Sequence, residues 1–325
     1  MKRLIKFIVI LLILLLVLVY KFHSQNTVIV NIENKKNIAI IGGMNSGYHW
    51  GTIKRGAEAA AREFNINIEY SAPNDEGDIE GQIKLVNLAL EKKVDALILA
   101  PSDYEAMVDI IKKAYDKGIP VIIIDSQVNT DKIYCYVGTD NLEAGKKAGN
   151  VLVSSVPENA KVAIINFFKG SKNAEEREEG IRSIISKYPG IKIAANEYCY
   201  SDVSRAYNLT KEIIAKHGDI NAFVALNALS SEGVAEAINE LKLQKKIKII
   251  AFDSTTSEIE FLEKGVIQAT IIQNPFSIGY LGVKNAVNVI SGRKVPRNID
   301  TGSKLIDKNN MSLPENQKLL FPFVK

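Results

Sequence analysis

Short runs of branched apolar residues alternate with amphipathic stretches along most of this chain. The first apolar run, at residues 37–41, breaks into Gly42-Gly43 and a polar segment that ends in His49-Trp50. An apolar run of this length predicts a buried strand, and the helical period over residues 52–64 predicts a helix that covers it. We expect the polar segment between them to form a loop that faces a ligand.

This alternation continues in two successive series. Strand and helix patterns at this spacing predict right-handed crossovers and a parallel, doubly wound sheet. Asp78 and Ser102 are expected to cap helices, and Gly118 to end one. The first series has predicted strands at 37–41, 66–71, 96–99 and 120–124 and predicted helices at 52–64, 78–92 and 102–117. The second has predicted strands at 161–166, 191–200, 222–225 and 248–252 and predicted helices at 141–154, 173–188, 203–217 and 231–241.

Two series of this kind predict two lobes of similar fold. With 325 residues, of which 46% are hydrophobic, the chain is long enough to bury two substantial cores. A further helical pattern at 276–291 and an irregular tail with a strand-like stretch at 304–306 follow the second series. These late elements indicate that the chain crosses back between the lobes, and several crossings would make a hinge.

The N-terminal segment has a different pattern. Residues 7–20 form an unbroken apolar run, preceded by Lys2, Arg3 and Lys6 and followed by Lys21. This pattern predicts either an uncleaved membrane anchor or a secretory signal over residues 1–21, and the bulky, polar exit from the run favours the anchor. Residues 22–36 read as a tether. Positive charges before the span would leave the rest of the chain outside the cytoplasm, on a single-pass membrane protein.

Charge and cysteine usage exclude several classes. Four of the 41 basic residues lie in the N-terminal segment, and the remaining 37 are balanced by 37 acidic residues. This balance argues against a nucleic-acid partner. Cys135 and Cys199 are far apart, without a CxxC motif or a nearby histidine, so we expect buried free thiols rather than a metal site.

Several ordered motifs carry a resemblance to a known family. They are the 38–50 segment, Leu97-Ile98-Leu99-Ala100-Pro101-Ser102-Asp103, the strand ending in Asp125-Ser126, Gly138-Thr139-Asp140-Asn141, and Ile250-Ala251-Phe252-Asp253-Ser254-Thr255. Over residues 37–306 the chain resembles the type I periplasmic sugar-binding proteins, with the ribose-binding branch closest. The resemblance implies an α/β fold of two doubly wound parallel-sheet lobes with a three-strand hinge. The N-terminal lobe would comprise residues 37–139 and 274–302, and the C-terminal lobe residues 140–273 and 303–325.

The resemblance also implies a sugar site between the lobes. The ligand-binding residues expected from it are Asn45, His49, Trp50, Asp125, Ser126, Asn173, Glu175, Arg177, Asn227, Asp253 and Gln273. The chain departs from the ribose-binding pattern at His49-Trp50, where that branch has paired phenylalanines, at Ser126, where it has arginine, and at Ala100, where it has asparagine. Around the arginine of the second lobe, Glu175 aligns best and Arg177 lies two positions on. These departures argue against ribose itself without excluding it.

The residue types suit a sugar, although each has an ordinary structural explanation. Carboxylates and amides hydrogen-bond hydroxyl groups, and a rigid indole ring packs on the C–H face of a pyranose. The alternatives are helix caps or turns for the two aspartates and Asn227, and core packing for Trp50. His49 could equally be a capping or core histidine, and Arg177, in a run of glutamates, could lie on a solvated helix face.

No enzymatic motif accompanies these residues. The three histidines and the absence of a GxSxG, HExxH or P-loop motif argue against catalysis, and neither a cofactor nor a metal is expected. The expected function is an extracytoplasmic receptor for a sugar, a pentose such as D-xylose, that closes on its ligand. An uncleaved anchor favours a sensor that signals to a membrane-bound histidine kinase. The alternative is the substrate-binding component of an ABC sugar transporter, with a permease as its partner.

Overall fold

The computed structural model describes residues 35–321 of the chain. The predicted anchor at 1–21 and nearly all of the predicted tether lie outside the described residues. Within the part that is described, none of the helices combines the length and the apolar character needed to cross a bilayer.

The strands form two sheets of six strands each. The first sheet has the order β11-β5-β4-β3-β1-β2, and the second has the order β12-β10-β9-β8-β6-β7. All neighbouring pairs are parallel except β10 and β12, which are antiparallel. The first sheet contains β1 (Asn37–Ile41), β2 (Asn67–Ser71), β3 (Ala96–Leu99), β4 (Val121–Asp125), β5 (Cys135–Gly138) and β11 (Asn298–Asp300). The second contains β6 (Lys161–Asn166), β7 (Lys192–Tyr198), β8 (Ile220–Ala225), β9 (Lys248–Phe252), β10 (Ala269–Ile272) and β12 (Lys304–Asp307).

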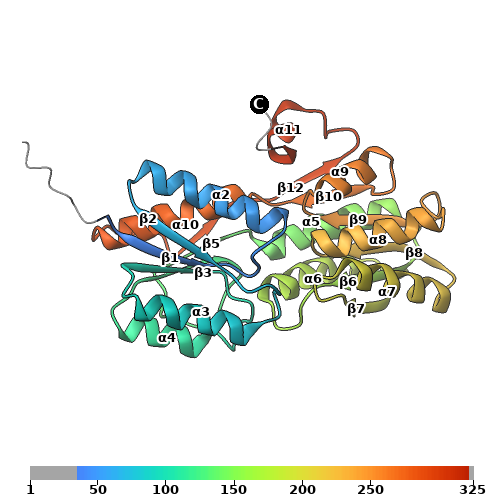
Figure 1. The fold of residues 1–325 in the computed structure, drawn as a ribbon. Coiled ribbons are helices and arrows are strands. Elements are labelled where there is room, and N and C mark those ends of the chain that lie inside the picture. The colour runs from blue at the N-terminus through green and yellow to red at the C-terminus, as the bar shows by residue number, and fades with distance from the viewer. Residues whose placement is uncertain (1–34, 322–325) are drawn as a thin grey trace, which may run out of the picture. The chain divides into compact units, whose positions relative to one another are not determined.

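Helices cover both faces of each sheet, and each sheet with its helices is called a lobe below. In the first lobe, α2 and α10 pack together on one face, and α3 and α4 lie on the other (Figure 1). In the second, α5 packs against α6, and α8 packs against α7 and α9. The first-lobe helices are α2 (Tyr48–Glu63), α3 (Ile79–Glu91), α4 (Val108–Asp116) and α10 (Pro275–Ile290). The second-lobe helices are α5 (Asn141–Ser155), α6 (Lys172–Ile185), α7 (Val203–Lys216), α8 (Ala228–Glu240) and α9 (Thr256–Glu263), and the short α11 (Pro314–Leu320) follows β12.

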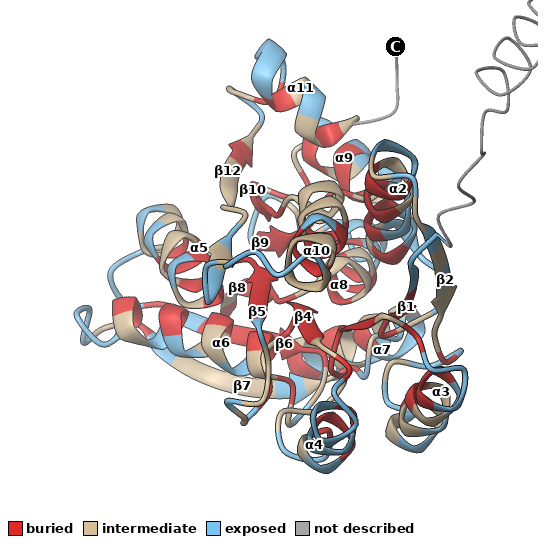
Figure 2. Ribbon diagram, turned by 90° about the vertical axis from the view of Figure 1, so that its left-hand side faces the viewer, coloured by how far each residue is buried: buried red, intermediate tan, exposed pale blue. Residues whose placement is uncertain are grey.

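The hydrophobic cores lie between each sheet and its helices. Central strands such as β3 and β4 are buried along their whole length, because helices cover both of their faces. The edge strands β2 and β7 are only partly buried (Figure 2). This layered α/β fold with two lobes confirms the fold class predicted for this part of the chain.

Three passages of the described chain connect the lobes. The chain passes from the first lobe to the second between β5 and α5, returns between β10 and α10, and passes again between β11 and β12. Four of the elements around these passages were not predicted: α9, β10, β11 and α11. They are short, and β11 and α11 lie in the tail that we expected to be mostly irregular. The exact lobe boundaries stay a prediction.

Two predicted helix starts are wrong by four residues or more, for identifiable reasons. Helix α2 begins at Tyr48 instead of residue 52, so His49 and Trp50 lie in its first turn instead of in a loop. Helix α4 begins at Val108, and Ser102 is not its cap. Instead, the Asp103 carboxylate accepts hydrogen bonds from the amides of Glu105 and Ala106 and holds a turn before the helix.

Other local predictions are confirmed. The Asp78 side chain caps α3 by accepting a hydrogen bond of 2.8 Å from the Gly81 amide. Gly118, with φ of 74°, follows the end of α4 in the left-handed conformation that ends many helices. Both cysteines are free and buried, and burial raises the pKa of each thiol to about 11.

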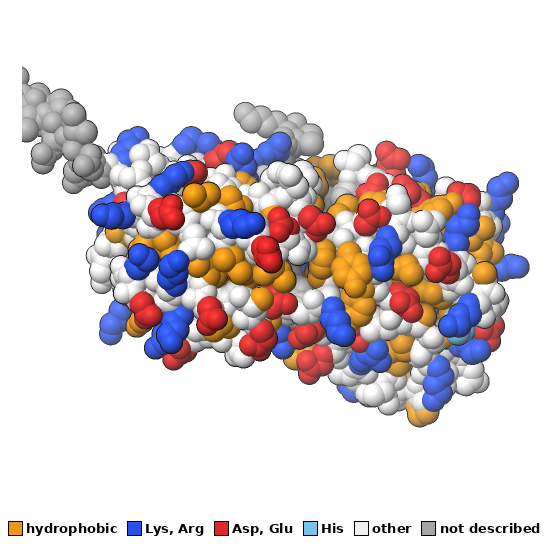
Figure 3. Space-filling view, turned by 60° about the horizontal axis from the view of Figure 1, so that its bottom comes forward, with side chains coloured by type: hydrophobic (Ala, Val, Ile, Leu, Met, Phe, Trp, Pro, Cys, Tyr) orange, Lys and Arg blue, Asp and Glu red, His pale blue; other side chains and the backbone are white. Residues whose placement is uncertain are grey.

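The surface mixes both charge signs. On the face shown in Figure 3, Lys and Arg side chains are interspersed with Asp and Glu side chains over both lobes. This distribution agrees with the balanced charge of the sequence and provides no basic stripe on that face for a phosphate backbone.

Candidate functional site

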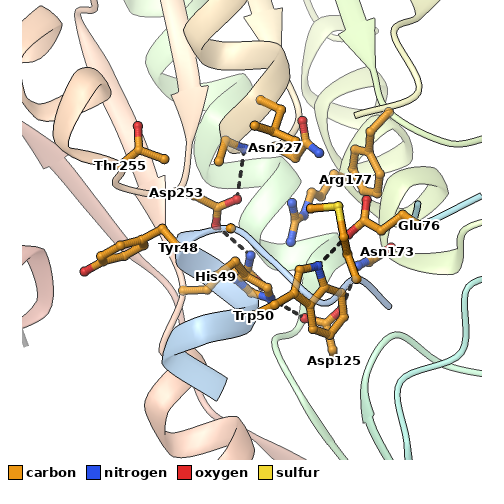
Figure 4. Close-up of a pocket in the computed structure, with 16 residues that line it drawn as sticks. Tyr48, His49, Trp50, Glu76, Asp125, Asn173, Arg177, Asn227, Asp253 and Thr255 are labelled. Carbon is orange, nitrogen blue, oxygen red and sulfur yellow. Dashed lines mark hydrogen bonds and ion pairs between the residues drawn. The ribbon is translucent and has the colours of Figure 1, made fainter. Parts of the chain in front are cut away.

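A pocket lies between the two lobes, where the carboxyl ends of the parallel strands face each other. This is the position at which open α/β sheets bind ligands. In Figure 4, Asp253 and Asn227 lie on one side of His49 and Trp50, and Asp125 lies on the other. The first lobe lines the pocket with Met44, Gly47, Tyr48, His49, Trp50, Glu76 and Asp125; the second lines it with Phe167, Asn173, Arg177, Asn227, Ala228, Leu229, Asp253, Thr255 and Gln273.

Asp125 is the first-lobe carboxylate of this pocket and ends β4. Its Oδ1 lies 2.7 Å from His49 Nε2, and its Oδ2 accepts a hydrogen bond of 3.5 Å from the Asn173 amide of the second lobe. The Tyr136 hydroxyl donates to its backbone carbonyl at 2.9 Å. Its partners therefore come from both sides of the cleft, and one of them, His49, has an ordinary pKa near neutral pH.

Asp253 is the matching carboxylate of the second lobe and directly follows β9. Gln273 Nε2 donates to its Oδ1 at 2.7 Å, and the Ala228 amide donates to its Oδ2 at 3.1 Å. The Thr270 hydroxyl donates to its backbone carbonyl at 2.6 Å. These partners are uncharged and belong to the second lobe or its exit to the first.

Both aspartates adopt the left-handed backbone conformation. The φ angle is 64° at Asp125 and 76° at Asp253. Such a conformation costs a non-glycine residue on the order of 1–3 kcal/mol and is concentrated at functional sites. The conformation turns the chain sharply at the end of each strand. Neither aspartate is the N-cap residue of a helix, although Asp253 accepts a hydrogen bond from the first amide of α8.

His49 and Asp125 form an ion pair when the imidazole is protonated. Burial by itself lowers the pKa of His49, but the charge of Asp125 and its hydrogen bond raise it, and Asp253 adds to the increase. The net pKa is raised, so the protonated form is favoured in the folded protein. The Asp125 oxygens keep further lone pairs that a ligand could use besides the bond to His49.

Arg177 is a buried cation that lies in the pocket. Only 2% of the residue is exposed, so the alternative of a solvated helix face is wrong. Its Nε donates to Asn141 Oδ1 at 2.9 Å, one terminal nitrogen donates to the Leu226 carbonyl at 2.6 Å, and its guanidinium lies 4.7 Å from the centre of the Phe252 ring. Burial lowers the pKa of Arg177, whereas the charges of Asp253 and Asp125 raise it. The two aspartates thus compensate a charge that solvent does not reach.

A chain of hydrogen bonds crosses the cleft through Glu76. Trp50 Nε1 donates to one carboxylate oxygen at 2.8 Å, and Ser201 Oγ of the second lobe donates to the other at 2.6 Å. Asn227 Nδ2 in turn donates to Ser201 Oγ at 2.9 Å. Burial raises the pKa of Glu76, although these two hydrogen bonds lower it in part. Glu76 therefore fixes the Trp50 ring and also ties the two lobes together.

The Gly42-Gly43 pair makes room for aromatic side chains. A Cβ at Gly43 would lie 2.5 Å from Trp50 Cζ2, and one at Gly42 would lie 2.2 Å from the Tyr70 hydroxyl. Glycine at these positions therefore leaves space for the rings of Trp50 and Tyr70 beside β1.

The structure brings most of the predicted site residues together, but not all of them. His49, Trp50, Asp125, Asn173, Arg177, Asn227, Asp253 and Gln273 line the pocket. Ser126 lies in an adjoining chamber. Asn45 is exposed and bonds to Asn74, and Glu175 is exposed with its carboxylate 3.9 Å from Lys172 Nζ, so neither lies in the pocket lining. Asn227 also caps α8 and Trp50 also belongs to a hydrophobic core, so both have a structural role besides their place in the pocket.

Sequence reasoning missed Glu76, Tyr48, Phe167 and Thr255 among the pocket residues. A signal was available for Glu76 and Phe167, because each follows the carboxyl end of a strand in its own parallel sheet, and ligands bind beyond such ends. Tyr48 was missed because the helix α2 was predicted to begin at residue 52 instead of at Tyr48.

The fold and the pocket define a two-lobed α/β binding protein with its ligand site between the lobes. Residues 38–294 match the model of the periplasmic binding protein domain, and the chain belongs to this family. It is 28% identical over 257 residues to the ribose import binding protein of Haemophilus influenzae, covering 79% of this chain and 86% of that protein. The D-allose-binding periplasmic protein of Escherichia coli is 26% identical over 267 residues, with the same shares of the two chains covered.

A solved structure has the same fold over nearly its whole length. The carbohydrate transporter solute binding protein of Agrobacterium radiobacter, in complex with D-arabinose, superposes with a TM-score of 0.86 at 30% identity. The match covers 89% of this chain and 99% of that one. These relatives are sugar-binding proteins, and the prediction that this chain is not an enzyme is confirmed.

Proposed function

We propose that this protein is an extracytoplasmic receptor that closes on one monosaccharide. The observation that carries the proposal is the pairing of Asp125 and Asp253, one from each lobe, around a pocket that also holds Trp50. Carboxylates from opposite sides select the orientation of ring hydroxyls, and the indole face packs against C–H groups. The relatives named for ribose and D-allose, and the solved structure in complex with D-arabinose, support a monosaccharide as the ligand. From the sequence we propose a pentose such as D-xylose.

The proposed mechanism is a shift toward the closed state. A ligand that touches both lobes binds the closed form better than the open form and therefore populates it. The contacts that join the lobes in this structure, Ser201 to Glu76 and Asn173 to Asp125, lie beside the pocket, where a sugar would add to them.

The single tryptophan of the chain provides the test. Because Trp50 lines the pocket and is the only tryptophan, a fluorescence titration of the full-length protein reports on this site alone. We expect saturable changes in emission with one or a few monosaccharides. No change with any of D-xylose, D-ribose, D-arabinose, D-glucose, D-galactose and D-allose would contradict the proposal.

For the partner, two proposals rest on different observations. The names of the ribose import protein and of the carbohydrate transporter solute binding protein support delivery of the sugar to an ABC permease. The sequence of residues 1–21, with its positive flank and poor cleavage site, supports a permanently anchored sensor that signals to a membrane histidine kinase. Sequencing the N-terminus of the protein isolated from cells decides between them. Loss of residues 1 to about 25 would exclude the anchored sensor.

A further inference from the structure

The end of the first lobe that lies opposite the cleft is rich in cations. All strands of the first sheet are parallel and have their carboxyl ends toward the pocket, so the turns that lead into these strands lie together at the opposite end. These turns contain nine Lys and Arg residues but only two carboxylates, those of Asp95 and Asp131. The cations, called the basic end below, are Lys35, Lys36, Lys92, Lys93, Lys117, Lys132, Arg293, Lys294 and Arg297.

Most of these charges are not neutralised within the fold. Asp95 and Glu69 each pair with one lysine, at N–O distances of 2.9 and 2.6 Å. The last turns of α2, α3 and α4 add three carboxylates and two cations, so the excess of positive charge remains. Both signs occur across the face shown in Figure 3, but Lys and Arg predominate toward the left, which is the first-lobe end in Figure 1. Three exposed lysines form no ion pair within residues 35–321: Lys93, Lys117 and Lys294.

Positive charge alone does not identify a partner for this end. Cations near the C-terminal end of a helix are stabilised by the helix dipole, and this effect accounts for part of the pattern. The far end of the second lobe has a similar group of exposed lysines, Lys242, Lys245 and Lys246, in the loop before β9. The two ends differ in where the chain enters the domain.

The chain enters the domain at the basic end of the first lobe. Lys36 directly precedes β1, and the predicted membrane anchor ends at residue 21. Residues 22–35 span at most about 50 Å even when fully extended, so an anchor in the bilayer would keep the basic end within that distance of the lipid. The attraction of cations to anionic lipid falls off over about 8 Å at physiological ionic strength. Unlike a phosphate backbone, a fluid lipid surface requires no regular stripe of cations.

We propose that the basic end of the first lobe rests on the anionic phospholipid headgroups of the membrane. This inference rests on the anchored form of the proposed function and adds an orientation to it. The exposed Lys93, Lys117 and Lys294 contact lipid phosphates, so the first lobe is held in place and the second lobe moves when the cleft closes. The sugar pocket lies at the opposite ends of the same strands, and the contact therefore leaves it free.

Energy transfer to labelled lipid tests this orientation. The full-length protein is placed in nanodiscs of phosphatidylcholine, with or without about one third phosphatidylglycerol. Both native cysteines are buried, so a dye can be attached selectively to Ser291→Cys at the basic end or to Ser186→Cys at the far end of the second lobe. These two serines are matched, because each is exposed and is the C-cap residue of a helix.

The expected result is a response of one dye only. Energy transfer from the Ser291→Cys dye to a headgroup acceptor should rise at least about twofold with phosphatidylglycerol, and the rise should disappear in about 1 M salt, where the Debye length is about 3 Å. Transfer from the Ser186→Cys dye should not depend on the lipid. The triple variant Lys93→Glu, Lys117→Glu, Lys294→Glu should abolish the rise.

The matched control reverses three charges on the other lobe. Lys242→Glu, Lys245→Glu, Lys246→Glu should leave the rise unchanged, and both triple variants should keep sugar affinity within about twofold, because all six lysines lie outside the pocket lining. Transfer that does not respond to phosphatidylglycerol, or that responds equally with both dyes or in both triple variants, overturns this inference and leaves the sugar receptor intact. Failure of the full-length protein to remain with the nanodiscs refutes the anchored form together with this inference. No heat in calorimetric titration with any sugar of the panel instead refutes the proposed sugar receptor.

Discussion

The two aspartates of the cleft occupy equivalent places in the two lobes but are held differently. Each lies at the carboxyl end of a central strand and has a positive φ angle. Asp253 is fixed by uncharged donors, Gln273 and the Ala228 amide, and this arrangement is complete within the second lobe and its exit strand. Asp125 depends on His49, which titrates, and on Asn173, which belongs to the other lobe.

This difference indicates a division of roles between the first-lobe half and the second-lobe half of the pocket. The second-lobe half is preorganised and should bind sugar with little rearrangement. The first-lobe half is completed only when the lobes meet, and its charge balance depends on a histidine. Affinity should therefore depend most on Asp253, while closure and pH dependence should reside on the side of Asp125.

The largest expected effect is that of Asp253→Ala. The substitution removes a carboxylate that would accept charge-assisted hydrogen bonds from the sugar, and it leaves the Gln273 amide and the Arg177 charge without that partner. We expect an affinity loss of about 100-fold, equivalent to about 3 kcal/mol, in the Trp50 fluorescence titration. Asp125→Ala should lose less than Asp253→Ala, and the reverse order would contradict the proposed division.

The second-largest effect is expected from replacing Arg177, the cation near Asp125 and Asp253. In Arg177→Lys, a single ammonium cannot reproduce the bonds to Asn141 and Leu226 or the stacking on Phe252. We expect about tenfold weaker binding and an unfolding temperature lower by about 2–4 °C. An unchanged affinity would mean that Arg177 is only structural.

Glu76 tests the link between the lobes. Glu76→Ala removes the acceptor for both Trp50 and Ser201, so we expect a larger radius of gyration without sugar in small-angle scattering, and about fivefold weaker binding. Glu76→Gln keeps the shape and an acceptor, and because burial raises the pKa of Glu76, it also removes the cost of the buried charge at neutral pH. This matched variant should stay as compact as the wild type. Equal radii of gyration for the wild type, Glu76→Ala and Glu76→Gln would show that Glu76 does not hold the lobes together.

A smaller effect is expected in the pH dependence of stability. The pKa of His49 is raised above its ordinary value of about 6.5, so its ion pair with Asp125 stabilises the fold fully below about pH 6.5. The stabilisation is lost as the pH rises through the raised pKa. Between pH 6 and 8.5, the unfolding temperature of the wild type should therefore fall about 2 °C further than that of His49→Gln. If the unfolding temperatures of the wild type and His49→Gln changed equally with pH, the His49–Asp125 ion pair would contribute nothing to stability.

The smallest effects are expected for Asn45→Ala and Glu175→Ala. Both side chains are exposed and lie outside the pocket lining, so sugar affinity should stay within about twofold of the wild type. A tenfold loss in either variant would show that the bound form rearranges around that residue.

The sequence predicts the sheets better than the ends of their helices. Buried strands such as residues 96–99 are unbroken apolar runs in the sequence, and the same residues form a strand in the structure. The start of α2 was misplaced because Gly47, His49 and Ser46 resemble a loop by composition, whereas the packing of Trp50 under Gly43 extends the helix. The turn at Asp103 was missed because its local hydrogen bonds compete with the helical pattern.

For the site, strand ends were the informative positions. Asp125 and Asp253 could be predicted because each polar residue interrupts an apolar run at the same edge of its sheet. The position of Glu76 after β2 was a signal for the site, but its role in joining the lobes could not be predicted, since it depends on Ser201, a residue 125 positions away that meets it only across the cleft. Ala100 and Ser126 were recognised as departures from the ribose-binding pattern, but only the folded chain shows that both line one chamber.

The most direct test of the account is a calorimetric titration of the full-length protein against the monosaccharide panel, with the furanosyl signalling compound autoinducer-2 added. We expect one site per chain with micromolar or tighter affinity for one sugar, and no binding of that sugar when Asp125 and Asp253 are both replaced by alanine. Heat that persists unchanged in this double variant would show that sugar is held elsewhere and would contradict the central claim.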